Sequence, residues 1–238
     1  MIKIKNLVKT YGKIRAVDDL SLTINEGEIF ALLGLNGAGK STTIKVLCLL
    51  TQKTGGKVEI AGLDLDEKGN EIKKIINLSP QETAVANNLT VRENLKLICD
   101  LYGIDNVGDA VDKYLKTLDL ESKEKCRARS LSGGQKRRLS LAMALITEPK
   151  ILILDEPTLG LDVKSRKELW RIISECKGKT TVVLTTHYLE EAERLADRIG
   201  VMRKGKLVAL GSAKEIVDSV GATDFENAFL VLAGGEDE

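Results

Sequence analysis

The chain lacks an excess of either charge. Its 238 residues include 36 lysines and arginines against 35 aspartates and glutamates, which gives a formal net charge of +1. A protein that binds nucleic acid regardless of sequence neutralises phosphates with surplus cations. We therefore expect no nucleic-acid partner. The basic run Lys136, Arg137 and Arg138 is interpreted as a solvated helix face.

Long apolar runs and clustered cysteines are also missing. No apolar stretch approaches the roughly 18–20 residues that cross a bilayer, so no membrane-spanning segment is predicted. Met1 to Asn6 alternates isoleucine and lysine, a pattern that indicates an edge strand and not a signal peptide. The four cysteines are widely separated, without a Cys-x-x-Cys pair. Reduced thiols in a cytoplasmic protein are expected in preference to disulfide bonds or a metal site.

Apolar runs that alternate with helical patterns predict the fold class. The segments 29–33, 151–154 and 182–184 are continuous apolar runs, typical of strands that are buried on both faces. Residues with helical spacing separate these runs, and strands alternating with helices imply a mostly parallel sheet. Period-two patterns before residue 25 predict further strands. The chain is therefore predicted to have an α/β fold.

The middle of the chain is predicted to be helical. Thr90 and Glu93 have the spacing of a capping box, and apolar residues at helical intervals follow them. A second helix is expected from Asp109, and a third over about 135–147. Together these patterns predict one α/β domain with a helical insertion in its middle.

A glycine-rich stretch after the first buried run fits the P-loop pattern, from Gly34 to Ser41. Its glycines allow backbone amides to approach phosphates, and the helix that follows adds the positive end of its dipole. Lys40 is expected to reach the β- and γ-phosphates, and the Ser41 hydroxyl to ligate Mg²⁺. A glycine-rich turn that binds nothing is disfavoured by the strand–turn–helix context. The predicted ATP cradle consists of Gly34, Asn36, Gly37, Ala38, Gly39, Lys40, Ser41 and Thr42.

Two carboxylates, Asp155 and Glu156, end the second buried run. In a parallel sheet this end of a strand meets the crevice where ligands bind. Asp155 is suited to hold Mg²⁺ through its water shell, and Glu156 to orient the attacking water or accept its proton. Alone, such a pair would more simply begin a solvent loop. Together with a P-loop, the catalytic interpretation is favoured.

One further motif resembles a known family. Leu131-Ser132-Gly133-Gly134-Gln135 resembles the signature of ATP-binding cassette (ABC) proteins, and it lies between the P-loop and the carboxylate pair as in that family. The resemblance covers essentially the whole chain. It implies a P-loop NTPase fold with a mostly parallel central sheet, an N-terminal antiparallel β subdomain and an inserted helical subdomain. We expect a single domain over 1–238, with a core lobe of about 1–81 and 136–238 and a helical subdomain of about 82–135.

The resemblance also implies roles for residues outside the P-loop. Tyr11 matches the aromatic residue that stacks on adenine, and Gln81 matches the glutamine that touches Mg²⁺ or water and senses the membrane partner. Asp162 belongs to a segment that resembles the D-loop, and His187 matches the switch histidine that donates to the γ-phosphate. Outside this family context, a lone tyrosine, glutamine or histidine more often has a packing or surface role.

In ABC proteins the signature meets phosphate across a dimer. The resemblance therefore implies a second ATPase subunit, with two copies enclosing two ATP molecules head to tail. Whether the two subunits are identical is left open. The signature residues of one copy would complete the site that contains Lys40 of the other. The implied catalytic set is Glu156, His187, Gln81 and Lys40, the Mg²⁺ set is Ser41, Gln81 and Asp155, and the nucleotide contacts across the dimer are Ser132, Gly133, Gly134, Gln135 and Asp162.

The predicted function is an ATPase subunit that drives separate integral membrane permease subunits from the cytoplasmic face of the cell membrane. Segments 186–193 and 225–230 resemble ATPases of the multidrug and sodium exporter group (ABC-2), so export is expected. The alternative is a soluble ABC ATPase acting on chromosomes, DNA repair or ribosomes. Chromosome and repair types carry a long coiled coil between P-loop and signature, where this chain has no sustained heptads. A P-loop kinase would leave the signature unexplained.

Overall fold

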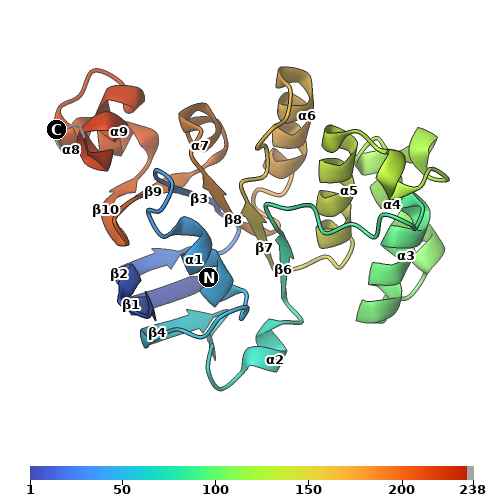
Figure 1. The fold of residues 1–238 in the computed structure, drawn as a ribbon, viewed down its shortest axis with the longest axis horizontal. Helices are drawn as coiled ribbons and strands as arrows, with labels where there is room; N and C mark the ends of the chain where they lie inside the picture. Colours follow the sequence, from blue (N-terminus) through green and yellow to red (C-terminus); the bar gives the residue numbers. More distant parts are fainter. Residues whose placement is uncertain (235–238) are drawn as a thin grey trace.

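The buried apolar runs of the sequence form the centre of a six-stranded sheet. The structure is a computed structural model that describes residues 1–234, so the last four residues of the predicted domain lie outside the described residues. The strand order is β10-β9-β3-β8-β7-β6, and every neighbouring pair is parallel except β10 with β9 (Figure 1). The strands are β3 (Ile29–Leu33), β6 (Ile76–Ser79), β7 (Ile151–Asp155), β8 (Thr181–Thr186), β9 (Arg198–Arg203) and β10 (Lys206–Gly211). The predicted mostly parallel sheet is thus confirmed.

A second, antiparallel sheet forms from the N-terminal strands in the order β2-β1-β4-β5. Its strands are β1 (Ile2–Tyr11), β2 (Ile14–Ile24), β4 (Gly55–Ile60) and β5 (Leu63–Asp64). The prediction of an edge strand at Met1 to Asn6 is wrong, because β1 pairs with β2 on one side and β4 on the other. The isoleucine–lysine alternation arises because one face of this sheet is buried while the other faces water.

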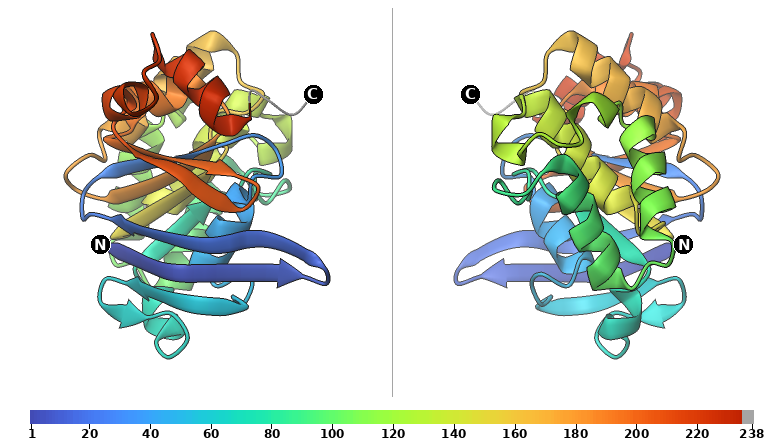
Figure 2. Two further views of the ribbon diagram at one scale, coloured as in Figure 1. Left: turned by 90° about the vertical axis from the view of Figure 1, so that its left-hand side faces the viewer. Right: turned by 90° about the vertical axis from the view of Figure 1, so that its right-hand side faces the viewer.

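Helix α1 (Lys40–Leu47) lies between the two sheets, as the two views in Figure 2 show together with Figure 1. Ile44 and Leu47 pack in one cluster with Phe30 and Leu32 of β3. The alternate residues of β3, including Ala31, face the other side of the sheet. The P-loop therefore leads from a strand that is buried on both faces directly into a helix that is held on both sides.

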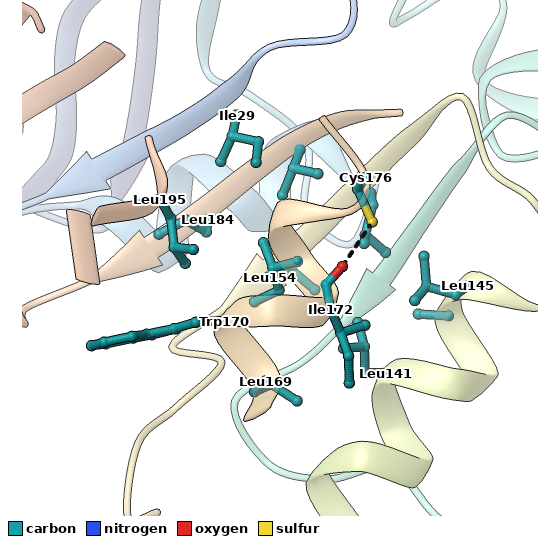
Figure 3. Close-up of a cluster of buried hydrophobic side chains, with 14 of the residues drawn as sticks. Ile29, Leu141, Leu145, Leu154, Leu169, Trp170, Ile172, Cys176, Leu184 and Leu195 are labelled. Carbon is teal, nitrogen blue, oxygen red and sulfur yellow. Dashed lines mark hydrogen bonds between the residues drawn. The ribbon is translucent and has the colours of Figure 1, made fainter. Parts of the chain in front are cut away.

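The opposite face of the central sheet is covered by helices (Figure 1). Figure 3 shows Leu169, Trp170 and Ile172 packed near Leu154 and Leu184 of the sheet. Trp170 is buried and packs in this cluster. The helices on this face are α5 (Gly133–Leu145), α6 (Val163–Ser174), α7 (Leu189–Leu195), α8 (Ala213–Val220) and α9 (Phe225–Ala233). The four cysteines are free thiols, as expected.

The predicted helical insertion consists of α3 (Val91–Tyr102), α4 (Val107–Thr117) and short 3-10 turns that lead to α5. Thr90 and Glu93 form the predicted capping box, with the Thr90 hydroxyl accepting from the Glu93 amide at 3.2 Å. Helix α5 begins before the predicted position, because Ser132 and Gln135 form a capping box of their own. A short helix, α2 (Gly69–Ile72), precedes β6. No helix among residues 1–234 is long and apolar enough to cross a membrane.

The packing of the central sheet generates a stability prediction. Leu152 of β7 is fully buried, so Leu152→Ala should lower the free energy of unfolding by about 2–5 kcal/mol. Urea denaturation followed by circular dichroism measures this change. The matched control is Leu101→Ala on α3, where the side chain is 70% exposed and the expected change is within about 0.5 kcal/mol. Equal effects of the two substitutions would contradict this assignment of the core.

Candidate functional site

A cavity of about 620 Å³ opens where the P-loop meets the carboxyl ends of the parallel strands. This volume is within the usual range for small-molecule sites. Residues 36–42 of the P-loop line it, together with Gln81, Glu156 and His187 from the segments that follow β6, β7 and β8. Arg15 lines it from β2, and the turn Lys204-Gly205 from the β9–β10 hairpin. Several of the predicted site residues therefore come together around one cavity.

The glycines of the P-loop shape the wall of this cavity. Gly39 has a φ of 104°, and a Cβ atom at this position would lie 2.4 Å from the Ala16 carbonyl oxygen. Gly37 also has a positive φ, but a Cβ there would meet no atom within 4 Å. Helix α1 begins at Lys40 with no side-chain cap and no acidic residue in its first turn. Such a helix start is a ready site for an anion such as a phosphate group.

Lys40 folds back over the P-loop and is only 5% exposed. Its Nζ donates to the Gly34 carbonyl at 2.7 Å and lies 3.6 Å from Glu156 Oε1. Burial lowers the pKa of Lys40, and the negative charge of Glu156 opposes that effect. A buried ammonium held between backbone carbonyls and a carboxylate is placed to gain from a phosphate as an additional anionic partner.

Ser41 of α1 and Asp155 of β7, both predicted to hold Mg²⁺, are in contact. Ser41 Oγ donates to Asp155 Oδ1 at 3.1 Å, and Thr185 Oγ1 donates to the same oxygen at 2.5 Å. Hydroxyl and carboxylate oxygens are the hard ligands that Mg²⁺ prefers. The donor chemistry at this point therefore fits the predicted ion, and Gln81 lines the same cavity as Ser41.

Glu156 and His187 form a pair beside Lys40. His187 Nδ1 lies 2.8 Å from Glu156 Oε2, and the Glu156 side chain is almost fully buried. The backbone of Glu156 has a φ of 49°, which is unusual for a residue with a side chain. Its amide donates to the carbonyl and the hydroxyl of Thr185, at 3.1 and 3.0 Å. Strand β8 therefore fixes the conformation that turns this carboxylate into the cavity.

The signature residues lie elsewhere. Within residues 1–234, Ser132, Gly133, Gly134 and Gln135 do not line the cavity that contains Lys40. They form the N-terminus of α5, where the exposed Ser132 hydroxyl accepts from the Gln135 amide at 3.3 Å. One copy of the chain therefore does not bring its signature to its own P-loop.

Asp162 and Tyr11 are also outside the lining of this cavity in the described part of the chain. Asp162 Oδ1 caps α6 by accepting from the amides of Lys164 and Ser165, both at 3.0 Å. Tyr11 is 45% exposed at the end of β1, with Lys9 Nζ 4.5 Å from its ring centre. The predicted nucleotide contacts of these two residues remain predictions.

The comparisons with known proteins agree with this geometry. A family model described as "ABC transporter" matches residues 17–159. The chain belongs to the ABC transporter family. Its fold matches that of a dimeric ATP-binding cassette in a post-hydrolysis state bound to ADP and Pi, with a TM-score of 0.81 and 29% sequence identity. That match covers 89% of this chain and 98% of the other. The chain is thus an ABC-type ATP-binding cassette.

Two curated relatives are similar over nearly the whole cassette. The daunorubicin resistance ATP-binding protein DrrA3 of Streptomyces coeruleorubidus is 40% identical over 223 residues, which cover 92% of this chain and 71% of that protein. The human phospholipid-transporting ATPase ABCA3 is 42% identical over 227 residues, 93% of this chain. The match spans only 13% of the human protein's length.

The interpretation of Arg137 in this cassette as part of a solvated face is wrong. Its side chain is only 4% exposed, and its guanidinium binds the segments that carry Gln81 and Glu156. The neighbouring Arg138 is largely covered too and forms ion pairs with Asp119 and Glu168. The sequence does contain a sign that Arg137 is buried. It precedes the apolar Leu141 by one helical turn and therefore lies on the same, buried face of α5.

A buried carboxyl, Glu191 on α7, connects segments of the cassette next to the site. Its Oε1 accepts from Thr158 Oγ1 at 2.8 Å and from Trp170 Nε1 at 2.9 Å. Its Oε2 is buried and has no hydrogen-bond partner among residues 1–234. Burial raises the pKa of Glu191, and the hydrogen bonds from the Thr158 hydroxyl and the Trp170 indole oppose that effect only partly.

The raised pKa of Glu191 predicts a pH-dependent stability. The folded state binds this proton more tightly than the unfolded state, whose glutamate titrates near pH ~4.3. The contribution to stability is thus complete below that pH and is lost as pH rises through the folded pKa. Glu191→Gln removes this titration, so the melting temperature of the variant relative to wild type should increase between pH 4 and pH 7. If the difference in melting temperature between variant and wild type does not change with pH, the pKa of Glu191 is not raised. The control is Glu190→Gln, which changes an exposed glutamate of the same helix, α7.

Proposed function

We propose that this chain binds ATP with Mg²⁺ in the cavity beside α1 and hydrolyses it to ADP and phosphate. The observation that carries the proposal is the convergence of Lys40, the Ser41–Asp155 contact and the Glu156–His187 pair on one cavity. Ser41, Asp155 and Gln81 would hold the Mg²⁺, which would supply positive charge to neutralise the β- and γ-phosphates.

The residues of the chain then divide the work of hydrolysis. The P-loop amides and Lys40 hold the phosphates. Glu156 orients the attacking water and accepts its proton as the oxygen–γ-phosphorus bond forms and the bond to the β-phosphate oxygen breaks. His187, which contacts Glu156, donates to the γ-phosphate. Tyr11 stacks on the part of the adenine that extends beyond the cavity.

We further propose that the complete site requires a second ATPase subunit. Ser132 and Gly133 of the signature are exposed and, among residues 1–234, do not line the cavity of their own P-loop, which is the arrangement expected if the signature serves a partner. Ser132, Gly133, Gly134 and Gln135 of one copy then contact the nucleotide held by Lys40 of the other, and Asp162 lies near the same junction. The dimeric ATP-binding cassette with the same fold supports this assembly.

The membrane partner is proposed to contact the helical insertion. A hollow of about 140 Å³ lies between β6, α3 and α5, and its lining includes Pro80, Ile98 and Tyr102. Leu101 and Tyr102 expose apolar surface on α3 beside it. Because Gln81 directly follows Pro80, a permease subunit seated here would sense the state of the nucleotide site. In this proposal the hollow lies where a core lobe (about 1–81 and 136–238) meets a helical subdomain (about 82–135).

We propose that the coupled process is export, with the chain on the cytoplasmic face of the cell membrane. The similarity to the daunorubicin resistance protein and to the phospholipid-transporting ATPase favours this direction. The alternative of a soluble chromosome or repair ATPase is less favoured. Helices α3 and α4, between P-loop and signature, are only 12 and 11 residues long, too short for an extended coiled coil.

Glu156→Gln tests the catalytic assignment. The variant should bind ATP, lower turnover by roughly 10²- to 10⁴-fold because the general base is lost, and accumulate as a dimer with ATP. Phosphate release measures the turnover, and size-exclusion chromatography measures the dimer. The variant Lys40→Ala provides a contrast: it should lose affinity for the nucleotide, because the buried cation at the P-loop is removed. Normal turnover of Glu156→Gln would remove Glu156 from this role.

Affinity purification from the solubilised membranes of the host tests the transporter assignment. A stoichiometric multi-span membrane protein should accompany the tagged chain, and Leu101→Asp should remove it by placing a charge on the proposed contact. The control is Leu230→Asp on α9, where an exposed leucine lies far along the chain from α3. Recovery with ribosomal or chromosomal proteins instead would support the soluble alternative and leave the ATPase site unaffected.

A further inference from the structure

Arg137 lies shortly after the signature on α5, yet its side chain reaches two other segments of the chain. Within the described residues, its guanidinium makes five hydrogen bonds, all to backbone carbonyl oxygens. The acceptors are Pro80 and Gln81 (3.0 Å for Gln81), Asp155 (2.8 Å), Glu156 (2.7 Å) and Pro157 (2.7 Å).

This arrangement uses the complete donor set of an arginine. A guanidinium carries five N–H groups in a fixed planar fork, and here each of its three nitrogens donates at least once. Lysine would retain the charge, but its three donors on a single nitrogen cannot reproduce the fork. The bonds are directional and the group is buried, so none of them can be replaced by water without opening the structure.

The five acceptors belong to the two segments that carry proposed catalytic groups. Pro80 and Gln81 follow β6, while Asp155, Glu156 and Pro157 form the end of β7 and the start of the loop after it. Glu156 has the left-handed backbone conformation described above, and a bond from Arg137 reaches its carbonyl. A shift of α5 would therefore be passed to the Gln81 segment and to the backbone that aims the Glu156 carboxylate.

We propose that Arg137 is a positioning residue that makes the geometry of Glu156 and Gln81 depend on the position of the signature helix. This rests on the proposed function, in which the N-terminus of α5 contacts the nucleotide of the partner subunit. Arg137 then connects the two nucleotide sites of the dimer, because α5 serves one site while Glu156 of the same chain serves the other. Correct docking of α5 on the partner's nucleotide completes the alignment of Glu156.

A purely structural role would give a different result. If Arg137 only stabilises the fold, its loss should lower stability, nucleotide affinity and turnover together. If it positions Glu156, ATP binding should persist, because Lys40 and the P-loop amides do not contact Arg137 among the hydrogen bonds of residues 1–234. Turnover alone should then fall.

The test is Arg137→Lys in the full chain, with Arg92→Lys as the matched control. Arg92 lies on α3 in the helical insertion and, like Arg137, makes several hydrogen bonds, but to Asp112 and Glu124, away from the cavity. We expect Arg137→Lys to lower kcat by roughly 10- to 100-fold, because small displacements of a catalytic group are costly. The KM for ATP and the ATP affinity should stay within about twofold of wild type. Arg92→Lys should retain wild-type kcat.

Hydrogen exchange provides a second measurement that does not depend on turnover. In the wild-type protein with Mg²⁺ and ATP, protection of residues 132–136 and 155–159 should rise together over one range of ATP concentration. In Arg137→Lys the two segments should respond over separate ranges. Both measurements are repeated with Arg137→Gln, which keeps hydrogen-bonding capacity without charge.

Two results would overturn the proposal. One is a kcat for Arg137→Lys equal to that of Arg92→Lys, with both segments still responding together. The other is a loss of ATP affinity and thermal stability in step with turnover in both Arg137 variants, which would make the side chain a support of the fold. An inactive wild-type chain would instead refute the proposed ATPase function, so the two failures are distinguishable.

Discussion

The parallel pairing of β7 with β8 is the constraint on which the candidate site depends. Its register places Asp155 directly beside Thr185, so the carboxyl ends of both strands meet next to the cavity. Thr185 then does two things, since its hydroxyl donates to the Asp155 carboxylate and accepts from the Glu156 amide. A slip of one residue would exchange the buried faces of the strand and separate these groups. The apolar residues on both faces of β7 therefore fix a polar geometry at its end.

Several charged groups are buried around this pair, and each is compensated differently. Among residues 1–234, the Lys40 ammonium pairs with backbone carbonyls and with Glu156, and the Arg137 guanidinium donates to five carbonyls. Glu191 accepts two hydrogen bonds at Oε1 and none at Oε2 in the same part of the chain. Burying a charge is costly unless partners replace water, so such a cluster is not a source of stability. Burying these charged side chains lowers the stability of the fold, but their hydrogen bonds fix the directions in which they point. The apolar clusters on the two faces of the central sheet supply the stability that offsets this cost.

Local patterns predicted most of the fold and the centre of the site. The P-loop, the Asp155–Glu156 pair and the position after β8 that His187 occupies are short segments next to buried strands, and parallel topology brings such strand ends together. The position of β1 in its sheet was not predictable in this way. Alternation along Ile2–Ile4 specifies a half-buried strand, but pairing with β4 depends on a segment far along the chain. The same holds for Glu191, whose donors come from two other segments.

Arg137 shows why the type of a residue does not by itself predict the contacts of its side chain. A run of three basic residues suggests one solvated surface, yet on a helix successive residues point in directions about 100° apart. Lys136, Arg137 and Arg138 therefore cannot share an environment, and in the structure Arg137 is buried while Arg138 forms ion pairs near the surface. Burial of Arg137 is tolerated because strands β6 and β7 end nearby and leave carbonyl oxygens beyond the regular sheet. The carbonyl oxygens at the ends of these strands thus hold α5 through Arg137. The N-terminus of α5 stays exposed, as contact with another subunit requires.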